Sequence, residues 1–252
     1  VNILRGPQGT LFGRNSTMGV LGLHTNKAAE DQEGRIALTL GNYNTRKVEG
    51  VFNTPISDEV AVRIAVGHSE RDGYGENVLT GDDNDIGSRN ADSARFSMLY
   101  TPTDSIEVNW SVDYSHTKKK GNMLVWDQRS YNDPNFDRSG NLNTSLAGNA
   151  LIIAGDTYKI NQVNDDRQDD KNLGTSLIID ADLENGGVLR SVTGYRTWKN
   201  DVVESDILRS PLDLLSRSAQ FDSSSWSQEI NYLSPEDNGP FSYVAGLYYF
   251  QE

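Results

Sequence analysis

The side chains best suited to catalysis or metal binding are few in this sequence and lie far apart. The three histidines, His24, His68 and His116, have no HExxH or comparable ligand spacing. Cysteine is absent, so there is no thiolate ligand, no cysteine nucleophile and no disulfide framework. The GxSxG elbow of serine hydrolases is missing as well. The sequence therefore predicts a protein that is not an enzyme, with no catalytic residue, no metal site and no cofactor.

Acidic side chains are more numerous and gather in two segments that we expect to be loops. They are Asp82, Asp83 and Asp85 in the first segment, and Asp165, Asp166, Asp169 and Asp170 in the second. The first has part of the spacing of a calcium-binding loop but lacks the glycine and the terminal glutamate of an EF-hand. Solvated loop charge is the expectation for both. The functional alternative is weak capture of cations, or of the cationic face of a substrate.

A segment near the N-terminus is the most distinctive part of the chain. From residue 4 to residue 19 it reads LRGPQGTLFGRNSTMG. Its glycines supply positions where φ can be positive or two backbones can approach, and Pro7 fixes its own φ. We expect short strands on either side, at residues 1–4 and 19–25. Arg5 and Arg14 bracket the turn, where a guanidinium can form forked hydrogen bonds with a carboxylate on a neighbouring wall.

Other readings of these glycines have less support. A phosphate-binding loop needs Lys-Ser or Lys-Thr after the last glycine, and the segment has neither. The dinucleotide fingerprint GxGxxG is also absent. A surface hairpin turn without function stays open on glycine content alone.

Taken as a whole string, the segment resembles the end of the plug domain of TonB-dependent outer-membrane transporters. There the pattern is approximately LRGPx[GS]xL[FY]Gxx[AS]xGG. The plug-motif residues of this chain are Arg5, Gly6, Pro7, Gly9, Gly13, Arg14 and Gly19. Met18 stands where the family usually has the first of two glycines, and Gly22 where it usually has an asparagine. These departures affect the local turn geometry.

The resemblance implies a plug enclosed by a barrel of about 22 strands. It implies substrates bound from outside the cell, most often ferric siderophores and sometimes cobalamin, haem, nickel or carbohydrates. The TonB complex of the inner membrane would open a path by pulling on an N-terminal box, which we expect to precede this sequence. By the same resemblance, Arg5 and Arg14 tie the plug to the barrel wall, with Glu107 and Glu229 as candidate partners.

Charge and composition limit the partners. The net charge is −13, which argues against nucleic acid because phosphate contacts need clustered Lys and Arg. The only basic run, Lys118 to Lys120, is expected just beyond a strand, as solvated loop charge or as a contact for anionic lipid headgroups. No apolar run approaches the roughly 18 residues of a membrane helix. Barrel strands stay possible, because they need apolar residues on one face only.

The hydrophobic pattern after residue 34 has a period of two. In the clearest example, Ile106, Val108, Trp110, Val112 and Tyr114 alternate with Glu107, Asn109, Ser111, Asp113 and Ser115. Such a strand has one apolar and one polar face. A soluble sandwich and a barrel with a wet interior both alternate in this way, so the pattern alone does not separate them.

The lengths of the connections do separate them. We predict nine strands, at residues 35–43, 46–54, 59–70, 91–101, 105–117, 173–184, 187–199, 223–233 and 241–251. After the first hairpin, short links at 55–58, 102–104, 185–186 and 234–240 alternate with long links at 71–90, 118–172 and 200–222. Short turns at one rim and long loops at the other are typical of outer-membrane barrels. Aromatics near strand ends, as at Phe96, Tyr100 and residues 248–250, fit an interfacial girdle.

The sequence as a whole predicts an all-β fold, a partial transmembrane antiparallel barrel of about nine strands preceded by the end of a plug. We assign residues 1–30 to the plug and residues 31–252 to the barrel. The predicted function is energised uptake of a scarce nutrient, most often a ferric siderophore, in the bacterial outer membrane. The partners would be the TonB complex, the substrate and membrane lipids. A passive porin-like barrel and a secreted carbohydrate-binding sandwich, with Trp126, Trp198 and Trp226 as sugar platforms, are the alternatives. Nine strands leave an open arc, which we expect to be unstable as a soluble monomer.

Overall fold

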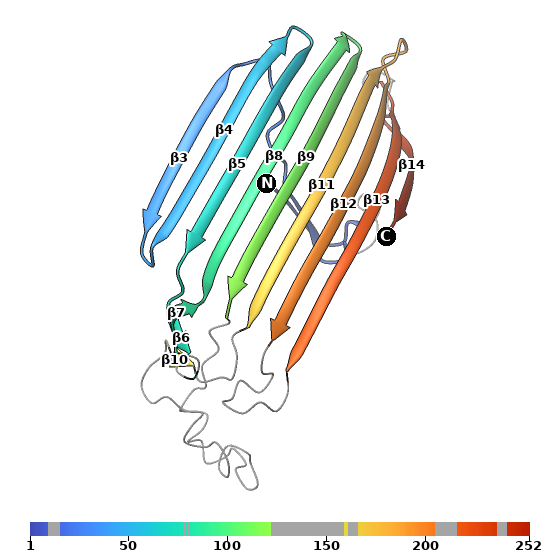
Figure 1. Ribbon diagram of the computed structural model, residues 1–252. Helices are drawn as coiled ribbons and strands as arrows, with labels where there is room; N and C mark the ends of the chain where they lie inside the picture. Colours follow the sequence, from blue (N-terminus) through green and yellow to red (C-terminus); the bar gives the residue numbers. More distant parts are fainter. Residues whose placement is uncertain are drawn as a thin grey trace.

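The computed structural model describes residues 1–9, 16–77, 79, 81–121, 159–160, 166–204, 216–235 and 241–252, with the backbone alone for residues 82–85, 159–160 and 204. Nine antiparallel strands form one sheet in the order β14-β13-β12-β11-β9-β8-β5-β4-β3 (Figure 1). They are β3 (Glu33–Gly41), β4 (Thr45–Ser57), β5 (Val60–Arg71), β8 (Ser88–Thr103), β9 (Ile106–Lys120), β11 (Arg167–Asp182), β12 (Val188–Glu204), β13 (Arg217–Leu233) and β14 (Val244–Gln251). All nine predicted strands are confirmed, in consecutive order. A single curved sheet excludes the two facing sheets of a sandwich for the described residues.

After the first hairpin, whose tight turn lies at the long-loop end, short links join the strands at one end of the sheet and longer connections join them at the other, as predicted (Figure 1). The first hairpin turns through Tyr43 and Asn44, both with positive φ (57° and 51°), and Thr45 N–H donates to the carbonyl of Asn42 at 3.3 Å. Positive φ at both central residues is the mark of a type I′ turn, whose twist matches that of the strands it joins. The turn between β11 and β12 uses Gly186 at φ 78°.

The strands run further toward the long loops than the hydrophobic pattern predicts. Lys118 to Lys120, expected beyond a strand, are the last residues of β9, and Asp169 and Asp170, expected in a loop, belong to β11. Backbone pairing between β9 and β11 continues through all of these residues. Charged side chains give no apolar signal, so a pattern of hydrophobic residues misses strand ends that backbone hydrogen bonds and side-chain ion pairs hold together.

The long connection after β5 has strands of its own. β6 (Gly75–Asn77) and β7 (Asp82–Ile86) pair with each other, and β10 (Lys159–Ile160) adds to β6. Ile86 and Asn77 are fully buried there. This small sheet was not predicted. The predicted loop 118–172 otherwise lies mostly outside the described residues, with Trp126 and Asp165, as do residues 205–215 of the loop 200–222 and residues 236–240 of the last link.

The two faces of the nine-stranded sheet differ in composition. Directly paired residues share a face, so the register divides each strand into two sets. One set exposes large apolar side chains: Ile36, Leu38, Leu40, Val48, Phe52, Ile64, Val66, Trp110, Tyr114, Leu173, Tyr195, Trp226, Ile230 and Leu247. We call this the outer face. The other, the inner face, includes the polar partners Glu107, Asn109, Ser111 and Asp113, as the alternation predicted.

The conventional core is very small. Only Ala28, Ala61 and Ile86 are buried hydrophobic residues in the described part of the chain. No helix among the described residues is long and apolar enough to cross a membrane. Stability therefore comes mainly from the backbone ladder of the sheet and from whatever covers its outer face.

Aromatic residues follow the same two faces. Phe96, Tyr100 and Tyr249 have outer-face register, and Phe96 packs edge-on against Trp110 with ring centroids 5.6 Å apart. Tyr248 and Phe250 pair with Glu229 and Ser227 on the inner face. The predicted girdle is wrong for these two residues, because successive side chains of a strand point to opposite sides of the sheet.

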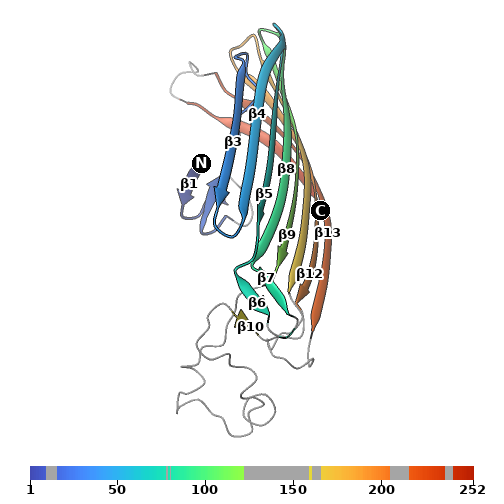
Figure 2. The same ribbon diagram turned by 60° about the vertical axis from the view of Figure 1, so that its left-hand side comes forward.

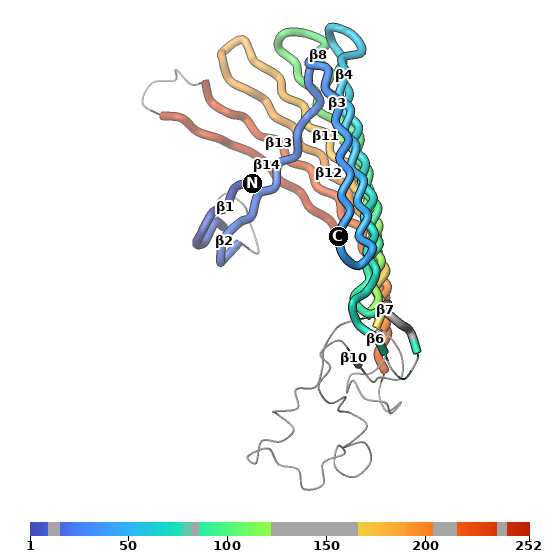
Figure 3. Tube along the Cα trace, turned by 90° about the vertical axis from the view of Figure 1, so that its left-hand side faces the viewer, coloured from blue at the N-terminus to red at the C-terminus, as the bar shows by residue number. Residues whose placement is uncertain are grey.

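The N-terminal segment lies on the concave side of the curved sheet (Figures 2 and 3). β1 (Asn2–Arg5) and β2 (Gly19–Gly22) form an antiparallel hairpin, close to the strands expected at residues 1–4 and 19–25. The chain then crosses the inner face and enters β3 at Glu33. We call residues 23–32 the connector.

Candidate functional site

The connector and the inner face of the sheet form the best-defined site in the described part of the molecule. A row of small residues crosses the inner face in direct register, and it consists of Ser97, Ser111, Ser176, Gly194 and Ser227. Small side chains leave room beside the sheet for another segment of chain. The connector occupies part of this room, because residues 23–28 and Ser97, Ser111 and Ser176 line the same cavity.

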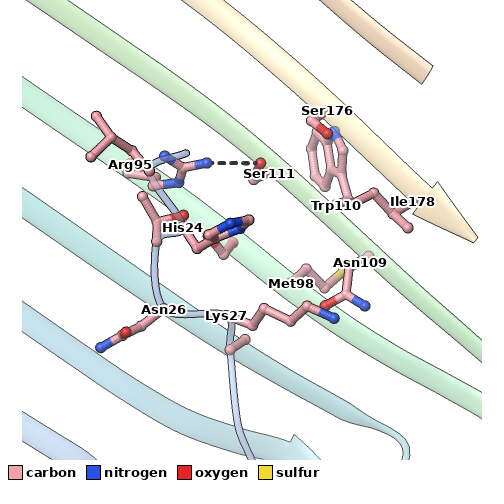
Figure 4. Close-up of a pocket in the computed structure, with 14 residues that line it drawn as sticks. His24, Asn26, Lys27, Arg95, Met98, Asn109, Trp110, Ser111, Ser176 and Ile178 are labelled. Carbon is pink, nitrogen blue, oxygen red and sulfur yellow. Dashed lines mark hydrogen bonds between the residues drawn. The ribbon is translucent and has the colours of Figure 1, made fainter. Parts of the chain in front are cut away.

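That cavity has a volume of about 260 Å³ and lies between the connector and strands β8, β9 and β11 (Figure 4). Arg95 lies above it and donates from Nη2 to Ser111 Oγ at 3.4 Å. Its Nε is buried and has no hydrogen-bond partner among the described residues. Ile178 adds an apolar side chain on the inner face, and Met98 and Trp110, which have outer-face register, also border the cavity. The cavity is a gap under the connector with mixed polar and apolar lining.

Asn53 of β4 fastens the end of the connector. Its Nδ2 donates to the carbonyls of Ala29 (2.7 Å) and Asp31 (2.5 Å), and its Oδ1 accepts from Ala29 N–H (3.1 Å). The side chain is only 1% exposed. A buried amide with both ends satisfied is stabilising, and its removal would leave backbone groups unpaired at a cost of about 1–3 kcal/mol. Asn53 therefore holds residues 29–31 in a fixed position against the sheet.

Lys27 makes a second attachment. Its Nζ lies 3.1 Å from Glu107 Oε1, which also accepts from Asn109 Nδ2 at 2.6 Å. The two side chains of the ion pair are 59% and 44% exposed. Exposed ion pairs contribute about 0.2–1 kcal/mol, so this contact orients the connector more than it stabilises it.

Further ion pairs link strands across the inner face. Arg190 donates to both oxygens of Asp180, at 2.6 and 2.9 Å. Arg196 reaches across β11 to Asp113 at 3.2 Å, and Arg63 binds Glu33 at 2.8 Å. Arg63 is well covered, with an 11% exposed side chain. None of these pairs, nor the Asn53 clamp, was predicted from the sequence, because which side chains meet depends on the register between strands and, except for Arg190 and Asp180, their members are distant in the chain.

The N-terminal motif has the backbone features expected of its glycines at two positions. Gly6 has φ 85° and Gly19 has φ 149°. A Cβ on Gly19 would lie 2.5 Å from the carbonyl oxygen of Leu4, so no side chain fits while the hairpin is closed. Gly9 has open space around it. Gly13 and Arg14 lie outside the described residues, and the plug role of the motif stays a prediction.

The predicted partners of Arg5 have other contacts. Glu107 binds Lys27, and Glu229 accepts a hydrogen bond from Asn231 Nδ2 at 2.7 Å. Within the part of the chain that the structure describes, Arg5 forms no ion pair, and its carbonyl accepts from Gln8 Nε2 at 3.4 Å. Its role in tying the hairpin to the wall is still a prediction.

The histidines are not brought together into a site. His68 Nδ1 lies 2.7 Å from Asp92, and His116 Nε2 lies 2.8 Å from Asp169, both on the outer face near the long loops. His24, at the start of the connector, has its Nε2 3.3 Å from Nδ2 of Asn2 in the hairpin. No group of three His, Cys, Asp or Glu residues that could hold a metal ion occurs among the residues described.

Asp169 and Asp170 of the second acidic segment are engaged within the sheet, Asp169 with His116 and Lys171. Asp170 accepts from Asn172 Nδ2 (2.7 Å), Trp198 Nε1 (2.9 Å) and Asn200 Nδ2 (2.7 Å). Trp198 in turn stacks on Phe221, with centroids 5.8 Å apart and planes at 16°. The predicted capture of cations has no support from Asp170, whose oxygens already accept three hydrogen bonds. Asp82, Asp83 and Asp85 lie where only the backbone is described.

Comparison with solved structures agrees with this architecture. No family model matches the sequence. The ferric yersiniabactin uptake receptor FyuA from Yersinia pestis matches with a TM-score of 0.77 and 17% identity over 98% of this chain and 35% of that one. The siderophore receptor PiuA from Acinetobacter baumannii gives 0.71 and 15%, over 98% and 34%.

The ferric-catecholate import receptor Fiu from E. coli K12 in its closed form gives a TM-score of 0.72 and 15% identity, over 98% of this chain and 35% of that one. This chain thus spans about a third of the length of each of these solved structures. At such low identities the likeness concerns the fold. The chain therefore has the fold of about one third of these β-barrel receptors.

Proposed function

We propose that the chain is part of a TonB-dependent receptor of the bacterial outer membrane that takes up a scarce nutrient, namely a ferric siderophore. The observation that carries the proposal is the connector, which follows the N-terminal hairpin and is held on the inner face of an antiparallel wall by Asn53 and by the ion pair of Lys27 with Glu107. A passive pore has no use for a segment fastened inside it. The matched solved structures are uptake receptors for iron chelates, which supports the substrate class.

The proposal divides the chain at the connector. Residues 1–30 would be the end of a plug and residues 31–252 the first part of the barrel. In support, Asn53 holds Ala29 and Asp31, and β3 begins two residues later at Glu33. The clamp therefore lies at the junction between the two proposed domains, where a pull on the plug would first meet the wall.

The motif residues would keep the plug closed and positioned. We assign this role to Arg5, Gly6, Pro7, Gly9, Gly13, Arg14 and Gly19. Gly6 and Gly19 shape the hairpin through positive φ. Because Glu107 already binds Lys27, a guanidinium from the plug would have to share that carboxylate or use another inner-face acid.

Transport of this kind needs no covalent step. A solute bound at the outside would shift the plug between closed and open arrangements by its different affinity for the two. The TonB complex would supply the energy, and membrane lipids would cover the outer face. Nucleic acid has no place in this scheme, in keeping with the net charge of −13.

The test is energised uptake by the complete protein. Cells lacking the gene should grow poorly under iron limitation on one ferric siderophore of a panel, and accumulation of its radioactive iron should stop when a protonophore collapses the proton-motive force. Fractionation should place the protein in the outer membrane. Uptake that persists without energy would replace this proposal with a passive pore.

A further inference from the structure

Three cationic residues stand in one row across the long-loop end of the sheet. Arg71 at the end of β5 pairs directly with Arg89 of β8, and Arg89 pairs directly with Lys119 of β9. Directly opposed side chains have Cβ atoms about 4.5–5.5 Å apart, and like charges in such positions are destabilising. Repulsion within this row destabilises the sheet, and a bound anion would reduce that repulsion.

The register places the row on the inner face. Arg71 is eight residues from Arg63, which binds Glu33, and β5 pairs with β8 without a bulge. Lys119 is twelve residues from Glu107, which binds the connector, and β9 pairs with β11 without a shift. Residues an even number of positions apart on a strand share a face, so Arg71 and Lys119 both lie on the inner face.

Carboxylates do not neutralise the row within the described part of the chain. Arg89 and Lys119 have no ion pair there, and Arg71 donates to the carbonyl of Gly87 at 2.7 Å and lies over the ring of Tyr74. The next residues of the row are neutral, because Lys119 pairs with Gln168 of β11. Two acids flank Arg71 in the sequence, Glu70 and Asp72, and Glu70 has outer-face register and binds Arg46 at 3.4 Å.

Two further acids lie near this end of the sheet. Asp72 borders the same hollow as the row, as Glu70 also does, and Asp166 borders the next hollow, of about 260 Å³, together with Lys119, Arg217 and Phe221. Neither acid belongs to the register row. The second hollow offers space beside Lys119 for a bound group.

Two cations of the outer face, Lys171 and Lys199, also oppose each other in the register, but each of them has a carboxylate beside it. Lys171 lies 3.7 Å from Asp169, and Lys199 lies 2.9 Å from Asp222. Lys118, next to Lys119 but on the opposite face, stands opposite Asp169 in the register. The chain has a net charge of −13, yet among its described residues Arg71, Arg89 and Lys119 stand in direct register without an ion pair. They lie on the face where a solute would pass.

We propose that Arg71, Arg89 and Lys119 form an anion-binding site on the inner face, and that the solute taken up presents carboxylate or other anionic oxygens to it. This rests on the proposed function for the identity of the solute, but the site itself does not. Arginine forks bind such oxygens with two parallel hydrogen bonds. A row of like charge in a channel wall also raises the local concentration of the oppositely charged solute.

The test measures local charge selectivity in the complete protein, without reference to transport. Ala91 lies on the inner face of β8, two residues from Arg89, and the 252 residues contain no cysteine. An Ala91→Cys variant in outer-membrane vesicles is labelled with an anionic methanethiosulfonate (sulfonatoethyl) and a cationic one (trimethylammonioethyl) at low salt. The ratio of the two rates is compared among three backgrounds.

The anionic reagent should be favoured by about tenfold more in the unaltered background than with Arg71→Gln, Arg89→Gln and Lys119→Gln together. High salt should abolish the preference. The matched control, Lys118→Gln, Lys171→Gln and Lys199→Gln, removes the same charge from the outer face and should leave the ratio within about twofold.

Equal ratios in the unaltered and inner-face backgrounds would overturn the proposal, as would an equal loss in the outer-face control, which would indicate net charge or lipid contact. Loss of heat-modifiable mobility on gels identifies a variant that has not folded, and the single changes Arg89→Gln and Lys118→Gln then replace the triple ones. Charge selectivity without energised iron uptake would contradict the proposed function alone, and uptake without charge selectivity would contradict this inference alone.

Discussion

The inner and outer faces of the nine-stranded sheet are built from the same strands, yet they meet different surroundings. The outer face exposes Ile36, Ile64 and Leu247 at 79%, 46% and 79%. The inner face holds a second segment of chain through Asn53 and Glu107. Alternation at period two produces both faces, but it does not say which one is wet. The connector identifies the inner face, because this polar segment is bound there by the polar side chains of Asn53 and Glu107.

The comparison also separates two kinds of charge. On the outer face, cations and anions lie side by side near the long loops, as His68 with Asp92 and Lys199 with Asp222 do. On the inner face, some charges tie strands or the connector together, and one row carries cations alone. Paired charges stabilise the wall, while unpaired charges of one sign can bind a solute of the opposite charge.

The largest effect expected from this difference concerns the isolated chain. The 252 residues alone, in buffer without detergent, should aggregate rather than form a monomer, because the outer face exposes a broad apolar surface and β3 and β14 have unpaired edges. Size-exclusion chromatography with light scattering measures this. A monodisperse chain that unfolds cooperatively in such buffer would show that the outer face needs no lipid.

A charge placed on each face in turn gives the next largest effect. Ala94→Lys introduces a cation on the outer face between Val66 and Tyr114, and should cost the complete protein about 2–4 kcal/mol in lipid if it lies near the bilayer centre. Its neighbour Ser93 is exposed on the inner face, so Ser93→Lys should cost less than about 1 kcal/mol. Urea unfolding of the protein refolded in vesicles, followed by tryptophan fluorescence, measures both. Equal costs would mean that the faces have been assigned wrongly.

The Asn53 clamp should show an intermediate effect confined to the connector. Asn53→Ala leaves the Ala29 amide and two carbonyls without their partner, at a cost of about 1–3 kcal/mol. Hydrogen exchange at residues 26–32, measured by mass spectrometry, should therefore speed up by about tenfold or more.

The matched control for the clamp is Asn172→Ala, which removes an inner-face amide bonded to Asp170 of its own strand. This change should leave exchange in the connector as it was. Unaltered exchange in Asn53→Ala would mean that the connector is held by other contacts.

The smallest effect belongs to the ion pair of Lys27 and Glu107. A double-mutant cycle with Lys27→Met and Glu107→Gln should give a coupling of about 0.2–1 kcal/mol that shrinks as salt is added, since both side chains are about half exposed. Unfolding of the complete protein in vesicles provides the four free energies. A coupling well above this range would show that the pair is shielded from water by a part of the plug.

Much of the fold could be predicted from the sequence, and the failures have physical reasons. Strong alternation, as from Ile106 to Ser115, located the strands, and turn residues located the short links. Strand ends rich in Lys and Asp were missed, because they are held by cross-strand pairing that has no hydrophobic signature. The aromatic residues Tyr248 and Phe250 were assigned by type, although position in the strand decides the face.

The site was less predictable than the fold. The motif from Leu4 to Gly19 indicated a rigid turn, and Gly6 and Gly19 do have positive φ. Nothing near Asn53 marks it as a clamp, since its partners lie more than twenty residues earlier and are backbone atoms. Lys27 and Glu107 are eighty residues apart, and only the order of strands in the sheet brings them together.

By itself, the sequence determined the local properties of the chain: where strands run, which residues share a face and where glycine permits a tight hairpin. These follow from the geometry of single residues and their neighbours. The tertiary structure alone decided which face is covered, what fastens the connector, and that Arg71, Arg89 and Lys119 stand in one row. Such contacts depend on register between strands, which backbone pairing across the whole sheet sets and no single segment contains.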